Sequence, residues 1–430
     1  MAGPPRTIDL HFGIVTPPVP GHIHPFCALG RELIERGHRV TVFHAGDIEL
    51  KIRDEGLEFT AIGAASFPLG SLGRSLDGIA GRKGFAALRF TIGEVARTTE
   101  MMLRDAPPAI RATGVDMLLV DQTEPAGGTI AEFLGIPFVT VCNALALNRE
   151  SDVPPPFSPW AYHPAWWARL RNQIGYAISD RVTAPIWKVV ADYRKLWKLK
   201  AHRSPDDSFS TVAQISQQPA LFDFPRRSLP AQFHYTGPLR KRSPIGIPFP
   251  WEKLDGRPLV YASLGTLQNR RFDVFHSFAA ACADLDAQLV ITHGGGLKAA
   301  EVSGLPGNPV IVPYAPQLEL LARASLTLTH AGLNTVLDSL IHGVPMVAVP
   351  ITFEQPAIAA RLRHAGAGEV VSLSDLKTRG LRHTVRRVLM ENSYRLSAKR
   401  IAESIRAAGG VARAAEIILD GAARSGSVSA

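Results

Sequence analysis

Two residues far apart in this chain, His22 and Asp121, could together form a general base. His22 lies in a loop between an expected strand at 8–16 and an expected helix from Pro25, and Asp121 follows an expected strand, Met117–Val120. The carboxyl ends of parallel strands meet at one edge of a sheet, so we expect the two side chains to lie close together. A carboxylate beside an imidazole fixes its tautomer and stabilises the imidazolium formed by proton uptake. The alternative is a loop histidine without a catalytic role.

A second group of polar residues follows an expected strand at 325–330. After the strand come a turn containing Gly332 and a helix that begins near Asn334. A helix that begins just past a strand end directs its free N–H groups and the positive end of its dipole outward, where they can bind an anion. His330 at the strand tip and the side chains of Asn334 and Thr335 can hydrogen-bond an oxyanion. The pattern therefore predicts a phosphate site.

Further polar residues extend this expected phosphate site towards a sugar. Asp338 lies one helical turn after Asn334 on the same face, where its carboxylate can accept hydrogen bonds from a ribose diol. Glu354 and Gln355 follow another expected strand, Met346–Pro350, and can reach sugar hydroxyls. Phosphate, ribose and sugar contacts in that order indicate a nucleotide-sugar site. The alternative is an ordinary strand–helix unit whose polar residues only cap the helix.

Residues 314–355 resemble the donor-binding signature of the UDP-dependent glycosyltransferases. The resemblance implies that Tyr314 stacks on uracil with Gln317 beside it, and that Asp338 binds the ribose. The phosphate-binding part of the signature is carried by His330, Gly332, Asn334 and Thr335, and the part that holds the glucose hydroxyls by Glu354 and Gln355. The chain departs from the plant members, which have Trp in place of Tyr314 and Leu333, and Glu in place of Asp338.

The same family places a catalytic His–Asp pair at the positions of His22 and Asp121, and its catalytic loop matches Gly21–Pro25. Within that loop, His24 is interpreted as a residue of the helix start. The resemblance implies an inverting displacement, in which His22 removes the proton of an acceptor hydroxyl as that oxygen attacks the anomeric carbon. We expect the leaving diphosphate to be stabilised by His330, Asn334, Thr335, Ser263 and Thr266.

Two shorter segments of the second half bear on how the leaving group is held. Ser263–Thr266 follows an expected strand, so its backbone can approach a phosphate, and a plain turn is an equal alternative. Asp284-Leu285-Asp286 superficially resembles the metal-binding acid pair of the other large glycosyltransferase fold, but it lies at an expected helix end and is interpreted as a turn. The arrangement requires no metal, and no cofactor is expected besides UDP-glucose as co-substrate.

Length and composition indicate a soluble two-domain enzyme. A chain of 430 residues exceeds one typical core, and 46% hydrophobic with 20% charged residues is ordinary for a globular protein. The N-terminus predicts no signal peptide, and the most apolar stretch, Gly127–Leu147, is too interrupted for a membrane span. Cys27, Cys142 and Cys282 are widely spaced and odd in number, as expected in a reducing cytoplasm. The net charge of +9 comes with no nucleic-acid-binding motif, so we expect no nucleic acid partner.

Short apolar strands alternate with helical patterns in both halves, which predicts an α/β protein with parallel sheets covered by helices on both faces. We expect an acceptor-binding domain at residues 1–236, a Pro-rich linker at 237–252 and a donor domain at 253–405. The final segment, 406–430, is expected to carry a helix at Val411–Leu419 that crosses back to the first domain, and a frayed tail at 421–430. The resemblance implies the GT-B fold, in which two Rossmann-like doubly wound sheets face each other across a cleft.

The acceptor is expected to bind mainly to the first domain, at residues 66–108 and 145–230. Residues 160–203 hold five of the six tryptophans, and nine Lys and Arg residues against two Asp residues. This composition favours a membrane interface or a large apolar acceptor. The alternative is a core-facing aromatic stripe, formed at helical spacing by Trp187, Val190 and Trp197, with a solvated basic face.

Several segments in both halves resemble the bacterial zeaxanthin glucosyltransferases of carotenoid pathways. They are Asp121–Gly127, Leu147–Glu150, Ala213–Gln217, Asp223–Arg226, Gly237–Arg240 and Ala262–Gln268. The resemblance implies transfer of glucose from UDP-glucose to the ring hydroxyls of a carotenoid diol, an apolar acceptor that suits a cytoplasmic enzyme in peripheral contact with a membrane. Three alternatives remain: a flavonoid, sterol or macrolide acceptor, a sugar-nucleotide epimerase of the same fold, and a non-catalytic nucleotide-sugar binding protein.

Overall fold

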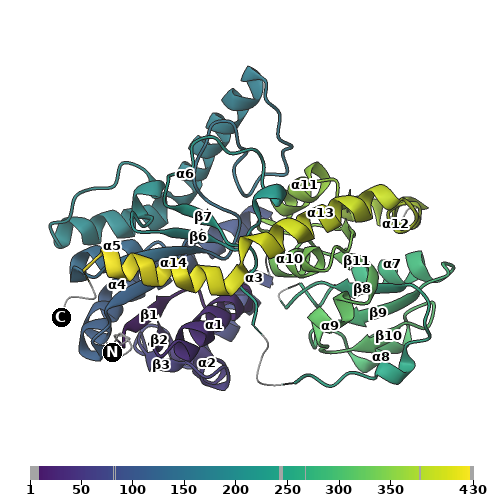
Figure 1. The fold of residues 1–430 in the computed structure, drawn as a ribbon, viewed down its shortest axis with the longest axis horizontal. Coiled ribbons are helices and arrows are strands. Elements are labelled where there is room, and N and C mark those ends of the chain that lie inside the picture. Colours follow the sequence, from purple (N-terminus) through teal and green to yellow (C-terminus); the bar gives the residue numbers. More distant parts are fainter. Residues whose placement is uncertain are drawn as a thin grey trace, which may run out of the picture.

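The computed structural model describes residues 9–80, 82, 84–241, 246–266, 268–376 and 379–426 (Figure 1). It contains two sheets, a seven-stranded one in the order β3-β2-β1-β4-β5-β6-β7 and a six-stranded one in the order β10-β9-β8-β11-β12-β13. All neighbouring strands are parallel. Both faces of such sheets are covered by helices, which explains the near-continuous apolar runs of the strands. The predicted α/β class with two doubly wound sheets is confirmed.

The first domain contains most of the chain before residue 240. Its strands are β1 (His11–Val15), β2 (Arg39–His44), β3 (Glu58–Ala61), β4 (Met117–Asp121), β5 (Phe138–Cys142), β6 (Gln214–Ser216) and β7 (Phe233–Tyr235). Its α-helices are α1 (Pro20–Glu35), α2 (Glu49–Asp54), α3 (Ser71–Ala80), α4 (Gly84–Thr113), α5 (Gly127–Leu134) and α6 (Trp166–Leu196). Short 3₁₀ turns are η1 (Gly46–Ile48), η2 (Pro205–Ser208) and η3 (Ala220–Phe222).

The second domain repeats the design. Its strands are β8 (Leu259–Ser263), β9 (Gln288–Thr292), β10 (Val310–Val312), β11 (Ala324–Thr329), β12 (Met346–Ala348) and β13 (Gly368–Val370). Its helices are α7 (Phe272–Cys282), α8 (Ala299–Ser303), α9 (Gln317–Leu321), α10 (Leu333–Ile341), α11 (Gln355–His364) and α12 (Arg379–Met390), with 3₁₀ turns η4 (Trp251–Lys253) and η5 (Leu373–Asp375). Among the described residues, no helix is both long and apolar enough to cross a membrane.

Each sheet has one point where the strand order reverses, between β1 and β4 in the first sheet and between β8 and β11 in the second. In open α/β sheets, ligands bind beyond the carboxyl ends of the strands at such a point, because the connecting loops diverge there and leave a crevice. The first crevice receives the segments that contain His22 and Asp121, and the second receives the segments that contain Ser263 and His330. The topology thus directs the predicted reacting and donor residues to equivalent places in the two domains.

Helix α1 begins five residues earlier than expected, so the prediction that His22 lies in a loop was wrong. Pro20 is the first helical residue, where a fixed φ suits the helix and a missing N–H costs nothing. The backbone amides of His22 and Ile23 both donate to the carbonyl of Val19, each at 3.0 Å. His22 therefore stands in the first helical turn, where its backbone is held by the helix.

Two C-terminal helices join the domains, as the yellow ribbons in Figure 1 show. Helix α13 (Asn392–Ala408) packs against α10 and η3, and α14 (Gly410–Arg424) packs against α1. The bend between them is at Gly409, whose φ of 85° favours glycine. The expected boundary between 405 and 406 falls inside α13, and α14 extends to Arg424, past the start of the tail that we expected to be frayed. Ile8, linker residues 242–245 and tail residues 427–430 lie outside the described residues.

Candidate active site

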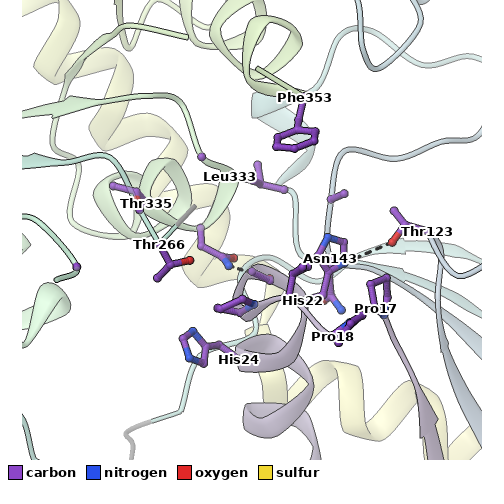
Figure 2. A pocket seen from close by; sticks show the side chains of 18 of the residues that line it. Pro17, Pro18, His22, His24, Thr123, Asn143, Thr266, Leu333, Thr335 and Phe353 are labelled. Carbon is purple, nitrogen blue, oxygen red and sulfur yellow. Dashed lines mark hydrogen bonds between the residues drawn. The ribbon is translucent and has the colours of Figure 1, made fainter. Parts of the chain in front are cut away.

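A cleft of about 1480 Å³ lies between the domains and collects the predicted site residues. Twelve of the thirteen line it, and the thirteenth, Asp121, lies behind His22. Figure 2 shows His22 beside Asn143 and Thr123, with Thr266 and Thr335 on the opposite side of the pocket. Pockets for one small ligand usually measure about 300–1000 Å³. The cleft therefore has room for two substrates.

His22 and Asp121 form the expected pair. The Nδ1 atom of His22 lies 2.8 Å from Oδ2 of Asp121, whose side chain is fully buried, whereas the His22 side chain is 18% exposed. A carboxylate accepts this hydrogen bond, so Nδ1 carries the proton and Nε2 is left unprotonated. An unprotonated Nε2 on a residue that lines the cleft is the arrangement that a general base requires.

Two residues that we did not predict hold the carboxylate of Asp121 in place. Thr123 donates its backbone amide and its hydroxyl to Oδ1, at 2.9 and 2.7 Å, and Nδ2 of Asn143 donates to Oδ2 at 2.9 Å. Asn143 directly follows β5, the strand next to β4, so the rule that paired His22 with Asp121 would also have found it. These donors keep the carboxylate ionised and fix its orientation toward the imidazole.

The pKa of His22 is raised by its surroundings. Burial disfavours the imidazolium, but the charge of Asp121, the hydrogen bond to it and the charge of Glu354 outweigh burial. The transfer rate should therefore fall as the pH is lowered through this raised pKa, because a protonated imidazole cannot accept a proton. The acid limb of kcat against pH should lie above about 6.5, the value of a free histidine. A limb below that value would contradict the assignment of His22 as the base.

His330 is a neutral hydrogen-bonding group in this site. Burial lowers its pKa to about 4, and a hydrogen bond with the backbone of Ser263 only partly offsets the effect. Its Nδ1 atom is buried, with no hydrogen-bond partner among the described residues. A Cβ atom added at Gly265 or Gly332 would lie 2.9 or 2.6 Å from its ring, so the two glycines let the imidazole fit between them. His330 can therefore give a phosphate a hydrogen bond rather than a charge.

Backbone strain marks two loops of the second domain that reach the cleft. Ala331 and Phe353 have φ values of 66° and 55°, a conformation that residues with a side chain rarely adopt. Ala331 leads directly into the start of α10, and Phe353 precedes the start of α11 and lines the cleft. Strained residues of this kind cluster where a structure must hold a loop in one shape for function.

Asp338 lines the cleft but already has protein partners. Its Oδ1 atom accepts from Nε of Arg240 at 2.5 Å, and its Oδ2 atom accepts from Nε2 of Gln317 at 2.6 Å. Arg240 also donates to Oδ1 of Asn334 at 3.0 Å and to Oε1 of Gln217 at 3.1 Å. Arg240 belongs to the segment predicted as a linker, and no local pattern indicated this contact between residues 98 positions apart. The linker is therefore part of the expected ribose site.

Asn334 connects the domains in this structure. Its Nδ2 atom donates to the carbonyl of Gly21, in the first turn of α1, at 2.8 Å. Its Oδ1 atom accepts from Gln217 and Arg240. The side chain thus holds the start of α10 beside His22, and the backbone amides of that helix start and Thr335 are the groups left for an oxyanion.

The acid–amide pair expected to bind the sugar lies at the start of α11. Oε2 of Glu354 accepts from the backbone amide of Leu145 in the first domain at 3.2 Å, and burial raises the pKa of Glu354. Oε1 of Gln355 accepts from the amides of Ile351 and Thr352, at 2.8 and 2.9 Å. This bond orients the side chain of Gln355 and leaves its Nε2 to donate to a sugar hydroxyl.

The other expected donor residues occupy the far side of the cleft. Tyr314 is 56% exposed, so its ring is available for stacking, and its hydroxyl donates to the carbonyl of Gly294 at 3.2 Å. Ser263 accepts the amide of Gly265 at 3.2 Å, and Thr266 is exposed. Asp284 and Asp286 lie in the turn between α7 and β9, and neither lines the cleft.

The part of the cleft formed by the first domain carries a group of large apolar side chains. This group comes from the segment before α3, from α3 and α4, and from the loop before α6: Phe67, Leu72, Leu76, Ile79, Val95 and Phe157. Most belong to residues 66–108, one of the two ranges expected to bind the acceptor, and only Phe157 comes from within 145–230, the other. An apolar surface on the His22 side of the cleft suits an acceptor with little polar surface.

The Trp-rich segment divides into two parts. Trp187, Val190 and Trp197 join a core cluster with residues of α4 and α5, as the core-facing alternative predicted. Trp166 and Trp167, in contrast, are 75% and 45% exposed. The tryptophans of this segment therefore lie in two different environments. Those in the C-terminal part of the segment pack against the core, and Trp166 and Trp167 at the start of α6 are exposed to solvent.

Comparison with known proteins agrees with this geometry. The chain matches the family model described as UDP-glucoronosyl and UDP-glucosyl transferase over residues 91–405, and the glycosyltransferase family 28 N-terminal domain over residues 20–141. A zeaxanthin glucosyltransferase of Pantoea ananas is 36% identical over 411 residues, or 95% of both chains. That of Pseudescherichia vulneris is 35% identical, over 97% of this chain and 100% of the relative.

Solved structures share the fold. The calicheamicin glycosyltransferase CalG4 superposes with a TM-score of 0.75 at 23% identity, over 97% of this chain and 99% of its own. The glycosyltransferase VinC, solved in complex with DTDP, superposes with a TM-score of 0.69 at 21% identity, over 96% and 99%. The two facing Rossmann-like domains are thereby confirmed as a GT-B fold.

Proposed function

This chain belongs to the family of UDP-glucoronosyl and UDP-glucosyl transferases, and we propose that it moves glucose from UDP-glucose to a hydroxyl of a carotenoid diol such as zeaxanthin. The observation that carries the proposal is that His22, which is hydrogen-bonded to Asp121, lines one cleft with the predicted donor residues and a group of large apolar side chains. Relatives named for zeaxanthin glucosylation, similar over nearly the whole chain, support this acceptor class.

In the proposed reaction, Nε2 of His22 accepts the proton of the acceptor hydroxyl. The acceptor oxygen forms a bond to the anomeric carbon while the bond from that carbon to the diphosphate oxygen breaks, so the configuration inverts. UDP leaves with the bonding electron pair, and Asp121 stabilises the new imidazolium. Negative charge that develops on the diphosphate is stabilised by hydrogen-bond donors. They are His330, Ser263, Thr266, Thr335 and the backbone amides at the start of α10. The proposed steps use proton transfer and hydrogen bonding by these residues, without a metal ion.

We also propose that the enzyme works in the cytoplasm. Cys27, Cys142 and Cys282 are buried free thiols, which supports a reducing compartment. These thiols take no part in the proposed reaction.

Replacing Asp338 by Ala should weaken UDP binding about 10- to 100-fold, because a buried ribose diol would lose its charged acceptor. Isothermal titration of UDP measures the effect. The control is Arg240→Met, which removes the ion-pair partner of Asp338 but keeps the carboxylate. If the two variants weaken UDP equally, Asp338 acts through Arg240 rather than on the ribose. Unchanged affinity in Asp338→Ala would remove this residue from the donor site.

Product analysis with UDP-glucose tests the proposed acceptor directly. Purified protein is offered zeaxanthin in detergent and, in parallel, a flavonol. Carotenoid mono- and diglucosides alone support the proposal, whereas a flavonol glucoside alone would keep the donor site and the His–Asp pair and reject the carotenoid. Conversion of UDP-glucose to another UDP-sugar without transfer would indicate an epimerase, and binding without any turnover a non-catalytic protein.

A further inference from the structure

The N-terminal half of α6 carries an exposed stripe of four large apolar side chains. They are Trp166, Leu170, Ile174 and Ile178, exposed to 75%, 50%, 53% and 58%. Their spacing of four residues places them along one side of the helix. Soluble proteins rarely leave a contiguous apolar surface of this kind uncovered unless it binds something. In Figure 1, part of α6 projects from the body of the molecule at the top of the view.

The side of α6 opposite to this stripe packs against a loop that reaches the cleft. Nδ2 of Asn172 donates to the carbonyl of Ser151 at 2.9 Å, and the hydroxyl of Tyr176 donates to that of Val153 at 3.2 Å. Gly175 lies so close to the same loop that an added Cβ atom would stand 2.7 Å from the ring of Trp160. The loop held in this way contributes Phe157, which lines the cleft and is 56% exposed. The helix that carries the stripe is therefore fixed, through its other side, to the loop that contributes Phe157.

The charges around the stripe favour an anionic surface. Residues 160–181 contain three arginines against one aspartate, Asp180, which pairs with Arg149. Arg181, which is exposed, follows Ile178 by three residues on the same side of the helix, and Arg171 lies over the rings of Trp160 and Trp167, at 4.9 and 5.6 Å from their centroids. Tryptophan and aliphatic side chains with basic residues beside them are typical of helices that lie in a membrane interface.

We propose that the stripe formed by Trp166, Leu170, Ile174 and Ile178 docks the enzyme on the surface of an anionic lipid bilayer. A second copy of this chain would bring an equally basic surface against the stripe, and like charges disfavour such a contact. Docking of the stripe would hold the enzyme at the surface of the bilayer in which an apolar acceptor dissolves. This consequence for the acceptor rests on the proposed function, whereas lipid binding does not.

Vesicle sedimentation of the full chain tests the docking surface without donor or acceptor. The variant Leu170→Gln/Ile174→Gln is compared with Met390→Gln/Leu396→Gln, a matched pair on the second domain whose side chains are 73% and 54% exposed. Binding to vesicles of phosphatidylcholine with phosphatidylglycerol should weaken about tenfold or more in the stripe variant and stay unchanged in the control. Vesicles of phosphatidylcholine alone should bind the wild type more weakly, because the basic residues then lose their partner.

A second measurement guards against a folding defect in the stripe variant. Brominated lipids should quench the tryptophan fluorescence of the wild type, and Trp166→Phe/Trp167→Phe should lose most of that quenching. Wild-type protein that fails to bind anionic vesicles, or a stripe variant that binds them normally, would overturn the proposal. A dimer in light scattering that the stripe variant abolishes, with vesicle binding unaffected, would assign the stripe to a second copy instead.

Activity assays separate this proposal from the proposed function. The stripe variant should glucosylate zeaxanthin in detergent at the wild-type rate and zeaxanthin in vesicles more slowly. Wild-type protein that binds vesicles through the stripe but glucosylates no carotenoid would support docking and reject the proposed acceptor.

Discussion

His22→Ala should lower kcat for glucosyl transfer by about 10³-fold, because the acceptor hydroxyl would have to attack without a base in place. UDP binding should change little, since the substitution removes a group that belongs to the acceptor side of the cleft. The Nδ1 atom of His22 is hydrogen-bonded to Asp121, so Nε2 is the atom that accepts the proton of the acceptor hydroxyl. The substitution removes this atom. Single-turnover kinetics with saturating UDP-glucose measure the chemical step, and titration of UDP measures binding.

The matched control for this variant is His24→Ala. His24 lies in the same helix and also lines the cleft, but the carboxylate of Asp121 is hydrogen-bonded to the imidazole of His22. Burial and the charges of Lys51, Arg240 and Arg31 lower the pKa of His24 to about 4, so His24 is neutral and unlike a base poised near neutral pH. Transfer that survives in His22→Ala and disappears in His24→Ala would show that the wrong histidine has been assigned.

Asp121→Asn should lower kcat by about 10²- to 10³-fold with little loss of fold, because the amide has the shape of the carboxylate but not its charge. The imidazolium formed in the reaction would lose its stabilising partner. The acid limb of kcat against pH should also move to lower pH, because the charge of Asp121 opposes the effect of burial on the pKa of His22. A pH profile of single-turnover rates records both effects.

Thr123→Val is the control that separates charge from positioning. It removes one hydroxyl donor to Asp121 and keeps the backbone donor, so the carboxylate stays ionised but is less well oriented. A loss of a few fold, with the acid limb of the pH profile nearly in place, is expected. An Asp121→Asn enzyme with the kcat and pH profile of the wild type would exclude Asp121 from the reaction.

Much of the fold and of the candidate site could be predicted because the relevant patterns are local. The strand β4, observed at Met117–Asp121, was predicted at Met117–Val120, since a short apolar run between turns has few other interpretations. His22 and Asp121 were paired by the rule that parallel strands present their carboxyl ends at one edge. The same rule, applied to the strand that ends at Cys142, would have added Asn143 to the site.

The features that escaped prediction depend on distant contacts. The ion pair of Arg240 with Asp338 joins the segment between the domains to the second domain, and nothing near either residue encodes the approach. The neutral state of His330 follows from burial between Gly265 and Gly332, which only the folded backbone brings to opposite sides of one ring. Helix α6 continues across Pro185, and its aromatic residues change from solvent to core along its length, so composition alone could not divide it.

The crossing of α14 has a consequence for how this protein is made. Ala414, Ile418 and Ala422 belong to the same buried cluster as Phe12 and Ile14 of β1, so the first domain shares its core with the last helix of the chain. Domains at the start of a chain commonly fold while the ribosome is still translating the remainder. Here, that domain cannot close its core until residue 422 has left the ribosomal exit tunnel. The nascent first half must wait, with apolar surface uncovered, until the second domain and α14 have been synthesised.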